Sequence, residues 1–429
     1  MTITIILSVL TCVGLITSVL LYPKIKIRKF NINTYWIVGL IGAFAILITG
    51  CISLEKVANG LTATDSINPI KILVLFISMT FLSVFLDEEG FFGYLAECVS
   101  RKAKSSQLKL FICFYAVVSV LTVFTSNDIV ILTFTPFICY FAKHVRINPV
   151  PYLVAEFAAA NTWSMLLIIG NPTNVYIATA SGIDFIAYLK VMALPTLFAG
   201  AIEMLIIYLL FRRQLKAPLV CDDEHVTLKD LPCLIIGLVH LVACLVLLVV
   251  SSYAQIEMWL ICLVTAVSLI VLVVGRLLFG HKPLSPLVRT TKRLPWDLIP
   301  FVLSMFVIVL ALKEQGVTSL IVKALSKGDS VYSYGISSFL VCNLINNIPM
   351  SVLFSTFASS GGLSAVYATV IGSNVGAFLT PVGALAGIMF TDLIRKQGVK
   401  YGFKEFVKYG AIISFPTLLA ALSGLAIIL

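Results

Sequence analysis

Residues Gly170-Asn-Pro-Thr-Asn174 interrupt an apolar run that extends from residue 152 to residue 180. Pro172 lacks a backbone donor and Gly170 tolerates positive φ, so the sequence predicts a helix that is broken here. In lipid, a break is stable only where protein, water or a ligand replaces the lost hydrogen bonds. The freed carbonyl groups and the Asn and Thr side chains can coordinate a cation, and the following half-helix points its positive end at an anion. A proline kink without a ligand is the alternative interpretation.

The composition around this break is that of a membrane protein. Of 429 residues, 60% are hydrophobic and 12% are charged. This excludes a soluble enzyme, a secreted domain and a nucleic-acid binder, and it leaves an all-α polytopic membrane protein, because long apolar runs dominate. The ten cysteines are scattered, mostly within apolar runs, which predicts neither a disulfide framework nor a metal site.

The apolar runs predict about ten transmembrane helices and two re-entrant hairpins. The hairpins are expected at 108–142 and 333–358, because each stretch has polar residues in its middle. The first run is interpreted as a helix rather than a cleaved signal peptide, since no basic stretch precedes it. The expected spans are 1–22, 33–54, 70–86, 152–180, 186–211, 231–250, 256–275, 297–312, 364–391 and 405–428.

The basic residues favour this topology. If both hairpins return to the side from which they came, six segments on one side hold 24 of the 30 Lys and Arg residues. Such a bias marks the cytoplasmic side, so both termini are expected outside. The six segments are 23–32, 87–110, 143–151, 211–230, 276–296 and 392–408.

The two halves of the chain resemble each other. We expect a first repeat at 70–212, a second at 297–429, and scaffold helices at 1–69 and 213–296. The tip Ser126-Asn-Asp128 resembles Ile345-Asn-Asn347, and the break at 170–174 resembles Leu379-Thr-Pro-Val-Gly383. Because the units enter the membrane from opposite sides, the repeat is inverted. Inverted repeats with interrupted helices indicate a secondary transporter whose site lies at the midplane.

Asp128 is the most informative single residue, because a carboxylate within an apolar segment is costly and usually marks an ion or proton path. Its alternative role is to cap the helix that follows. Glu203 is interpreted as a lipid-shielded structural carboxylate or a partner of Arg212, with a proton-linked site as the alternative. Glu156 is expected to face the membrane interface.

Asp87, Glu88 and Glu89 follow a predicted span on the cytoplasmic side. We expect them to form ion pairs with Arg101 and Lys102 and not to belong to the site.

The order of hairpin tip, broken helix and inverted repeat resembles the ion transporter superfamily over residues 70–429. That group includes arsenical pump membrane proteins, related sodium/proton antiporters, and citrate and dicarboxylate carriers. Leu86-Asp-Glu-Glu-Gly-Phe-Phe92, Ser126-Asn-Asp128 and Thr380-Pro-Val-Gly383 are similar to the arsenical pump branch, whereas Gly170-Asn-Pro-Thr-Asn174 is similar to the carboxylate carriers.

The resemblance implies cation sites between each tip and its neighbouring break, substrate between the tips, and a homodimer with an elevator motion. No cofactor is expected apart from Na⁺, and an ATPase partner would be needed for an ATP-driven arsenical pump. The candidate substrate-binding residues are Ser126, Asn127, Thr173, Asn346, Asn347, Thr380 and Pro381. The candidate ion-coupling residues are Asp128, Gly170, Asn171, Asn174, Asn374 and Gly376.

The leading hypothesis is a secondary transporter of a prokaryotic inner membrane that exports arsenite or antimonite against proton entry. Uptake of citrate or a dicarboxylate with Na⁺ or H⁺ is the first alternative, and sodium/proton antiport is the second. No Lys or Arg lies at a tip or break, which favours a small neutral oxyacid over a multiply charged anion. An intramembrane enzyme is not expected, because neither H-E-x-x-H nor G-x-S-x-G occurs. A passive channel remains a rival hypothesis.

Overall fold

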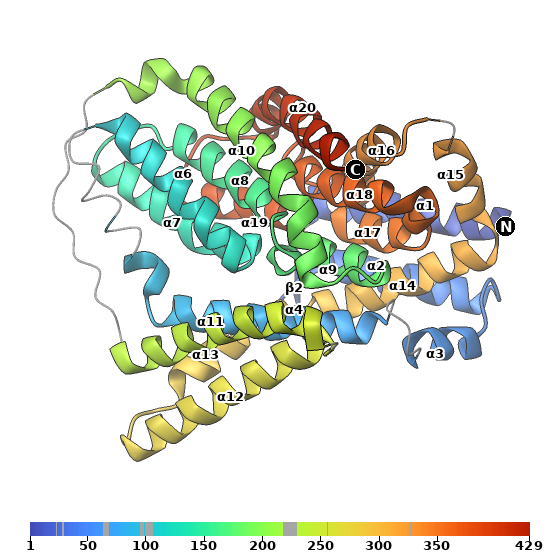
Figure 1. Ribbon diagram of the computed structural model, residues 1–429, viewed down its shortest axis with the longest axis horizontal. Helices are drawn as coiled ribbons and strands as arrows, with labels where there is room; N and C mark the ends of the chain where they lie inside the picture. The colour runs from blue at the N-terminus through green and yellow to red at the C-terminus, as the bar shows by residue number, and fades with distance from the viewer. Residues whose placement is uncertain are drawn as a thin grey trace.

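The computed structural model describes residues 1–22, 24–27, 30–62, 68–94, 98, 106–217, 230–254, 256–326 and 328–429. Within these residues the only sheet is an antiparallel hairpin of β1 (Lys24–Ile27) and β2 (Phe30–Asn33). The other regular elements are helices (Figure 1). Two of the expected partners, Arg101 and Lys102, lie outside the described residues.

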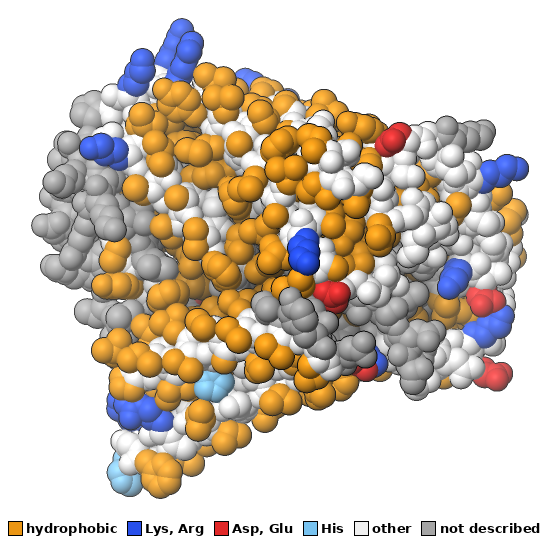
Figure 2. Space-filling model, in the orientation of Figure 1, with side chains coloured by type: hydrophobic (Ala, Val, Ile, Leu, Met, Phe, Trp, Pro, Cys, Tyr) orange, Lys and Arg blue, Asp and Glu red, His pale blue; other side chains and the backbone are white. Residues whose placement is uncertain are grey.

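Seven helical segments of the described chain are long and apolar enough to cross a membrane. They are α4 (Pro69–Glu88), α6 (Gln107–Phe124), α10 (Phe185–Leu215), the Leu231–Leu248 part of α11 (Leu231–Ala254), α12 (Met258–Phe279), Ser285–Glu314, which comprises α13 (Ser285–Arg293) and α14 (Leu298–Glu314), and α20 (Phe403–Ile428). Shorter apolar helices are Thr2–Ser18 of α1 (Thr2–Leu21), α2 (Thr34–Ile48) and α16 (Ser330–Ile345). Hydrophobic side chains are spread widely over the face shown in Figure 2, and few charged side chains lie among them. The prediction of an all-α polytopic membrane protein is confirmed.

The scaffold helices pack crosswise between the halves. Helices α1 and α2 pack together, and α2 packs on α14 of the second half. Likewise, α11 and α12 pack together, and α12 packs on α4 of the first half, at the lower edge of Figure 1. The helix pair that precedes each repeat in the chain therefore packs against the first long helix of the other repeat. Short helices α3 (Leu54–Thr62) and α15 (Val317–Leu325) flank this layer.

The stretch 108–142 folds as a hairpin. Helix α6 ends at Phe124 and α7 (Asn127–His144) begins three residues later. The ring of Phe114 on α6 lies 6.0 Å from that of Phe137 on α7, and both rings are equally far from the break. The chain on either side of the hairpin also meets, because the Tyr152 hydroxyl lies 3.2 Å from Gln107 Oε1. The chain therefore turns back, although α6 alone has the length of a span.

The second hairpin has the same form with a shorter second arm. Helix α16 ends at Ile345 and α17 begins at Asn347 and ends at Ser355. Beyond it, the ring of Phe357 lies 6.3 Å from the ring of Tyr334 on α16. The turn η2 (Ala358–Gly361) then leads into α18.

Each repeat contains an interrupted helix, and the second arm of each hairpin packs on the interrupted helix of the other repeat. Helix α7 contacts α19, and α17 contacts α9. The first interrupted helix comprises α8 (Val150–Trp163), η1 (Ile168–Gly170) and α9 (Pro172–Ala180), and the second comprises α18 (Gly362–Gly376) and α19 (Leu385–Lys396).

The structure aligns the two breaks differently from the sequence comparison, which set residues 170–174 against residues 379–383. The helix resumes at Pro172, two residues after Gly170, and at Leu385, two residues after Gly383. Gly170 therefore corresponds to Gly383 and not to Leu379. Asn161 and Asn374 then become equivalent. Both donate from Nδ2 to a carbonyl four residues earlier at 2.8 Å, which supports the new register.

Contacts at one end of the molecule join segments that the charge bias assigned to the cytoplasm. Asn148 donates to Gln214 at 2.9 Å, and Arg293 pairs with Glu88 at 2.7 Å. At the opposite end Lys71 pairs with Glu257 at 2.6 Å. The structure therefore places these segments at the same end of the molecule, as the predicted topology does.

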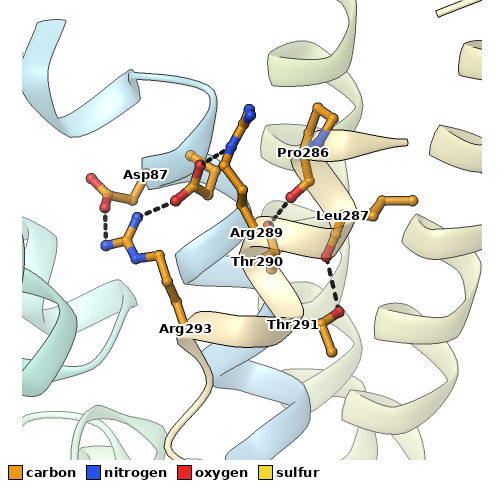
Figure 3. Close-up of polar contacts among 8 residues, drawn as sticks. Asp87, Pro286, Leu287, Arg289, Thr290, Thr291 and Arg293 are labelled. Carbon is orange, nitrogen blue, oxygen red and sulfur yellow. Dashed lines mark hydrogen bonds and ion pairs between the residues drawn. The ribbon is translucent and has the colours of Figure 1, made fainter. Parts of the chain in front are cut away.

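The acidic residues that end α4 form ion pairs with α13, whereas the expected pairs with Arg101 and Lys102 lie outside the described residues. Arg293 on α13 reaches Asp87 at 2.5 Å and Glu88 at 2.7 Å, and Arg289 reaches Glu88 at 2.9 Å (Figure 3). The sequence could not show this, because the arginines lie about two hundred positions along the chain from their partners.

Candidate functional site

A cavity of about 710 Å³ lies at the end of the molecule that carries the basic segments. Asp128 on the first hairpin, Pro381 in the second break and Asp297 at the start of α14 line it from the repeats, and Tyr35 lines it from the scaffold. Its wall also includes three exposed basic side chains, which are Lys292, Arg293 and Arg395. The cavity thus connects two predicted site residues with the end that carries the basic segments.

Asp128 lies in the first turn of α7 and is half-buried. Among the described residues its carboxyl group has no hydrogen-bond or ion-pair partner, and no backbone N–H donates to it. The N-cap position belongs to Ser126, whose hydroxyl also has no partner within the described chain. Asp128 therefore does not cap α7, and its carboxyl group is available to the cavity.

Four of the predicted ion-coupling residues lie together, away from this cavity. Asn374 accepts from Asn171 Nδ2 at 2.9 Å and from the Ser164 hydroxyl at 3.0 Å, and it donates to Asn174 Oδ1 at 2.6 Å. Gly170 allows the close approach, because a Cβ there would lie 2.2 Å from the carbonyl oxygen of Ser164. The first break is thereby joined to α18 of the other repeat through buried amides.

The tip of the first hairpin is attached to the same region. Asn127, predicted to bind substrate, is buried and donates from Nδ2 to Asn161 Oδ1 at 3.1 Å. Asn161 in turn donates to the carbonyl oxygen of Phe157. Asn127 therefore belongs with the asparagine network rather than with the open cavity.

The second tip and second break are joined by Asn343, which the sequence analysis did not single out. Asn343 Nδ2 donates to the carbonyl oxygen of Gly376 at 2.9 Å, and its Oδ1 accepts from the Thr380 hydroxyl at 2.7 Å. Gly376 has no room for a side chain, since a Cβ there would lie 2.3 Å from Cys342 Sγ. Two predicted site residues, Gly376 and Thr380, therefore share one positioning residue.

The paired asparagines of the second tip hold the loop that borders the cavity. Asn346 adopts a positive φ of 74° and donates from Nδ2 to the carbonyl oxygen of Val382 at 2.9 Å. The backbone N–H of Asn347 donates to the carbonyl oxygen of Gly383 at 2.9 Å. Both contacts orient the segment that contains Pro381.

The corresponding position on the opposite side is closed. A cavity of only about 20 Å³ lies between α9 and α17, large enough for one water molecule. Thr173, a predicted substrate residue, lines it together with Tyr176, Ile348 and Ser351. The Thr173 and Tyr176 hydroxyls have no partner within the described chain. Of the two cavities described, the large one therefore lies at the basic end, and the one between α9 and α17 has room for about one water molecule.

Of two buried glutamates, Glu156 differs from the prediction, and Glu203 agrees with the expected shielded carboxylate but not with the pair with Arg212. Glu156 does not face the interface but is 1% exposed, and the Thr135 hydroxyl donates to its two oxygens at 2.9 and 3.0 Å. Glu203 is fully buried and forms no ion pair with Arg212 in the described part of the chain. The packing of neighbouring helices, which decides both outcomes, is not visible in the hydropathy of one helix.

Asn161, Asn343 and Ser164 are the site residues that the sequence analysis missed. The available signal was an amide side chain inside an apolar helix one turn or more from a break. It is weak, because such side chains also occur where they only join helices.

An inverted repeat with two hairpins, two interrupted helices and a cavity between repeat and scaffold defines a membrane transporter. A family model described as "Citrate transporter" matches residues 30–360. The chain belongs to this citrate transporter family, within the ion transporter superfamily, and it is a multi-pass membrane protein.

Relatives and solved structures agree with this assignment. The chain is 26% identical over 380 residues to an arsenical pump membrane protein of Escherichia coli, covering 82% of this chain and 85% of that protein. It is also 26% identical to one of Yersinia enterocolitica over 377 residues, with the same coverage. The fold is similar to the YdaH transporter of Alcanivorax borkumensis, with a TM-score of 0.59, 14% identity, and coverage of 99% and 97% of the two chains. For MtrF of Neisseria gonorrhoeae, described with a class of antimetabolite efflux pumps, the TM-score is 0.54, the identity 14%, and the coverage 99% and 94%.

Proposed function

We propose that this protein is a proton-coupled secondary transporter that exports arsenite or antimonite in the form of the neutral trihydroxide. Two relatives that bear the name of arsenical pump support this substrate class. The bridge between the two repeats, made of buried amides, supports a mechanism in which tips and breaks move as one body.

The observation that carries the proposal is the charge of the cavity. Its three basic side chains are exposed at the cytoplasmic end, and two are already paired: Arg293 with Asp87 and Glu88, and Arg395 with Asp392. The polar side chain that the first hairpin contributes is the half-buried carboxyl group of Asp128. A citrate trianion would meet this carboxylate without a basic partner beside it. A neutral trihydroxide needs only hydrogen-bond donors and acceptors.

The second candidate function is uptake of citrate or a dicarboxylate with Na⁺ or H⁺. The family model supports it, and so does the N-terminus of α9 beside the first break. There Asn171 caps the helix by accepting from the Thr173 N–H at 3.2 Å. In this candidate a bound cation would neutralise Asp128 before the anion enters.

Transport by purified protein in liposomes tests the proposal. With an acidic lumen, we expect arsenite to accumulate in vesicles that contain protein and not in protein-free vesicles. Saturation distinguishes a transporter from a channel. Citrate or succinate accumulation driven by Na⁺ or H⁺, without arsenite transport, would replace the proposal by the second candidate. Proton release driven by Na⁺ alone would instead identify an antiporter. A thermal-stability screen against the same compounds checks binding, because a ligand of the folded state raises stability.

A further inference from the structure

Glu203 is a fully buried carboxyl group in the middle of α10 without a basic partner among the described residues. The Tyr115 hydroxyl lies 3.0 Å from its Oε1, and the Thr162 hydroxyl bonds its Oε2. A charge buried among neutral groups is costly, and in a membrane protein such a group is by default a functional candidate.

The position of Glu203 distinguishes it from an ordinary structural acid. The last turn of α8, Asn161–Ser164, has four consecutive side chains, and each bonds a different element. The partners, in chain order along this turn, are Asn127 at the first tip, Glu203 on α10, Tyr115 on α6 and Asn374 on α18. One helical turn therefore joins the buried acid to the hairpin tip and to the bridge between the repeats.

The contact between α8 and α10 is unusually close at this turn. A Cβ on Gly200 would lie 2.6 Å from the Trp163 ring, so only glycine fits without displacing the indole. The indole N–H donates to the Tyr115 hydroxyl oxygen at 3.2 Å, and that hydroxyl lies 3.0 Å from the Gly200 carbonyl oxygen. The Tyr115 proton thus has two acceptors, Gly200 and Glu203, between which it can turn.

Protonation of Glu203 changes the direction of these hydrogen bonds. When the carboxylate is ionised, Thr162 donates to Oε2 and Tyr115 to Oε1. When a proton binds Oε2, the new O–H donates to Thr162, whose own hydrogen must turn away. Tyr115 can then donate to Gly200 instead. Because Thr162 directly follows Asn161, which holds the tip through Asn127, the reversal acts on the residue next to the tip's anchor.

We propose that Glu203 is a proton-binding site, separate from the cavity, whose occupancy is transmitted through the last turn of α8 to the first hairpin tip. The inference rests on the proposed proton-coupled function. The described helices α6, α8, α11, α18 and α20 pack on α10. Of their titratable side chains, Tyr115 is the one in hydrogen-bond contact with Glu203, and none of the described side chains forms an ion pair with it. In each turnover Glu203 takes up one proton and later releases it.

Glu156 supplies a matched control. It is as deeply buried and lies on α8 itself, but its described side-chain contact is with Thr135 on α7 alone. It has no described bond to the last turn of α8. Replacement of either glutamate by glutamine keeps size and hydrogen bonding but removes the proton site.

The experiment compares Glu203→Gln, Glu156→Gln and the wild type in proteoliposomes, with arsenite as the probe. With a pH gradient of one unit, one coupled proton supports about tenfold accumulation. We expect Glu203→Gln to reduce this ratio to about one while arsenite exchange without a gradient continues, and Glu156→Gln to keep both. Full gradient-driven accumulation by Glu203→Gln would overturn the proposal.

Infrared difference spectra between alkaline and acidic pH provide a readout that needs no substrate. We expect a protonated-carboxyl band that Glu203→Gln loses and Glu156→Gln keeps. If no variant or wild type transports arsenite but this band behaves as expected, the proposed function fails and the proton site stands. If Glu203→Gln does not fold, Tyr115→Phe retains the acid and should shift the pH midpoint of the band. An unchanged band in both variants would refute the site.

Discussion

Replacement of Asn374 by alanine tests whether the buried amides join the two repeats. The side chain is inaccessible to solvent, and its four hydrogen bonds lead to Ser164, Asn171, Asn174 and the carbonyl oxygen of Val370. Ser164 can still donate to the carbonyl oxygen of Asn161 at 2.7 Å, and the Val370 carbonyl remains in its helix. The substitution therefore leaves two buried polar atoms without partners, Nδ2 of Asn171 and Oδ1 of Asn174.

Each unsatisfied buried group costs about 1–3 kcal/mol, so Asn374→Ala should lower the free energy of unfolding by roughly 2–6 kcal/mol. The loss is measured by denaturant unfolding or thermal inactivation in detergent, beside transport of arsenite. Transport should fall with it, because the first break is no longer fixed to α18.

Ser373→Ala is the matched control, since the neighbouring Ser373 is equally buried but its hydroxyl has no partner within the described chain. It should change stability by less than about 0.5 kcal/mol. The double variant Asn171→Ala/Asn374→Ala lacks Nδ2 of Asn171, which is one of the two atoms that Asn374→Ala leaves without a partner. Its loss of stability should therefore be smaller than the sum of the losses in the two single variants. Equal stability of Asn374→Ala and wild type, or full additivity, would refute the bridge.

Three further predictions concern other parts of the site. Asp128→Asn should leave stability within about 0.5 kcal/mol, because its carboxyl group has no described partner, but should abolish gradient-driven transport in proteoliposomes; full coupling in that variant would exclude Asp128 as a coupling residue. Arg293→Ala should destabilise the fold by about 1–3 kcal/mol, measured by thermal inactivation, because Asp87 and the nearly buried Glu88 both lose their ion pair with Arg293; an unchanged inactivation temperature would contradict this. Gly376→Ala should reduce folded yield on size-exclusion chromatography, and Cys342→Ala should restore it in part, since the clash is with that sulfur; equal yields with and without Cys342→Ala would show that the clash lies elsewhere.

Hydropathy and charge were sufficient to predict the class of fold. An apolar run must become a helix in lipid, and a polar tip or a Gly-Asn-Pro break must interrupt it, wherever the run lies in the tertiary structure. For this reason the sequence alone predicts the hairpin at 108–142 and the break at 170–174, and the structure has both. The basic segments likewise predicted their common end, because that bias depends on the membrane and not on packing.

The tertiary structure alone decided which polar groups meet. The correspondence of Gly170 with Gly383, the partners of Asn343 and the burial of Glu203 depend on how helices from distant parts of the chain pack. A shift of a helix by a fraction of a turn decides whether a hydrogen bond forms, whereas the sequence pattern places a helix only to within a few residues. The sequence therefore predicted where the chain breaks, and packing determined what each break binds to.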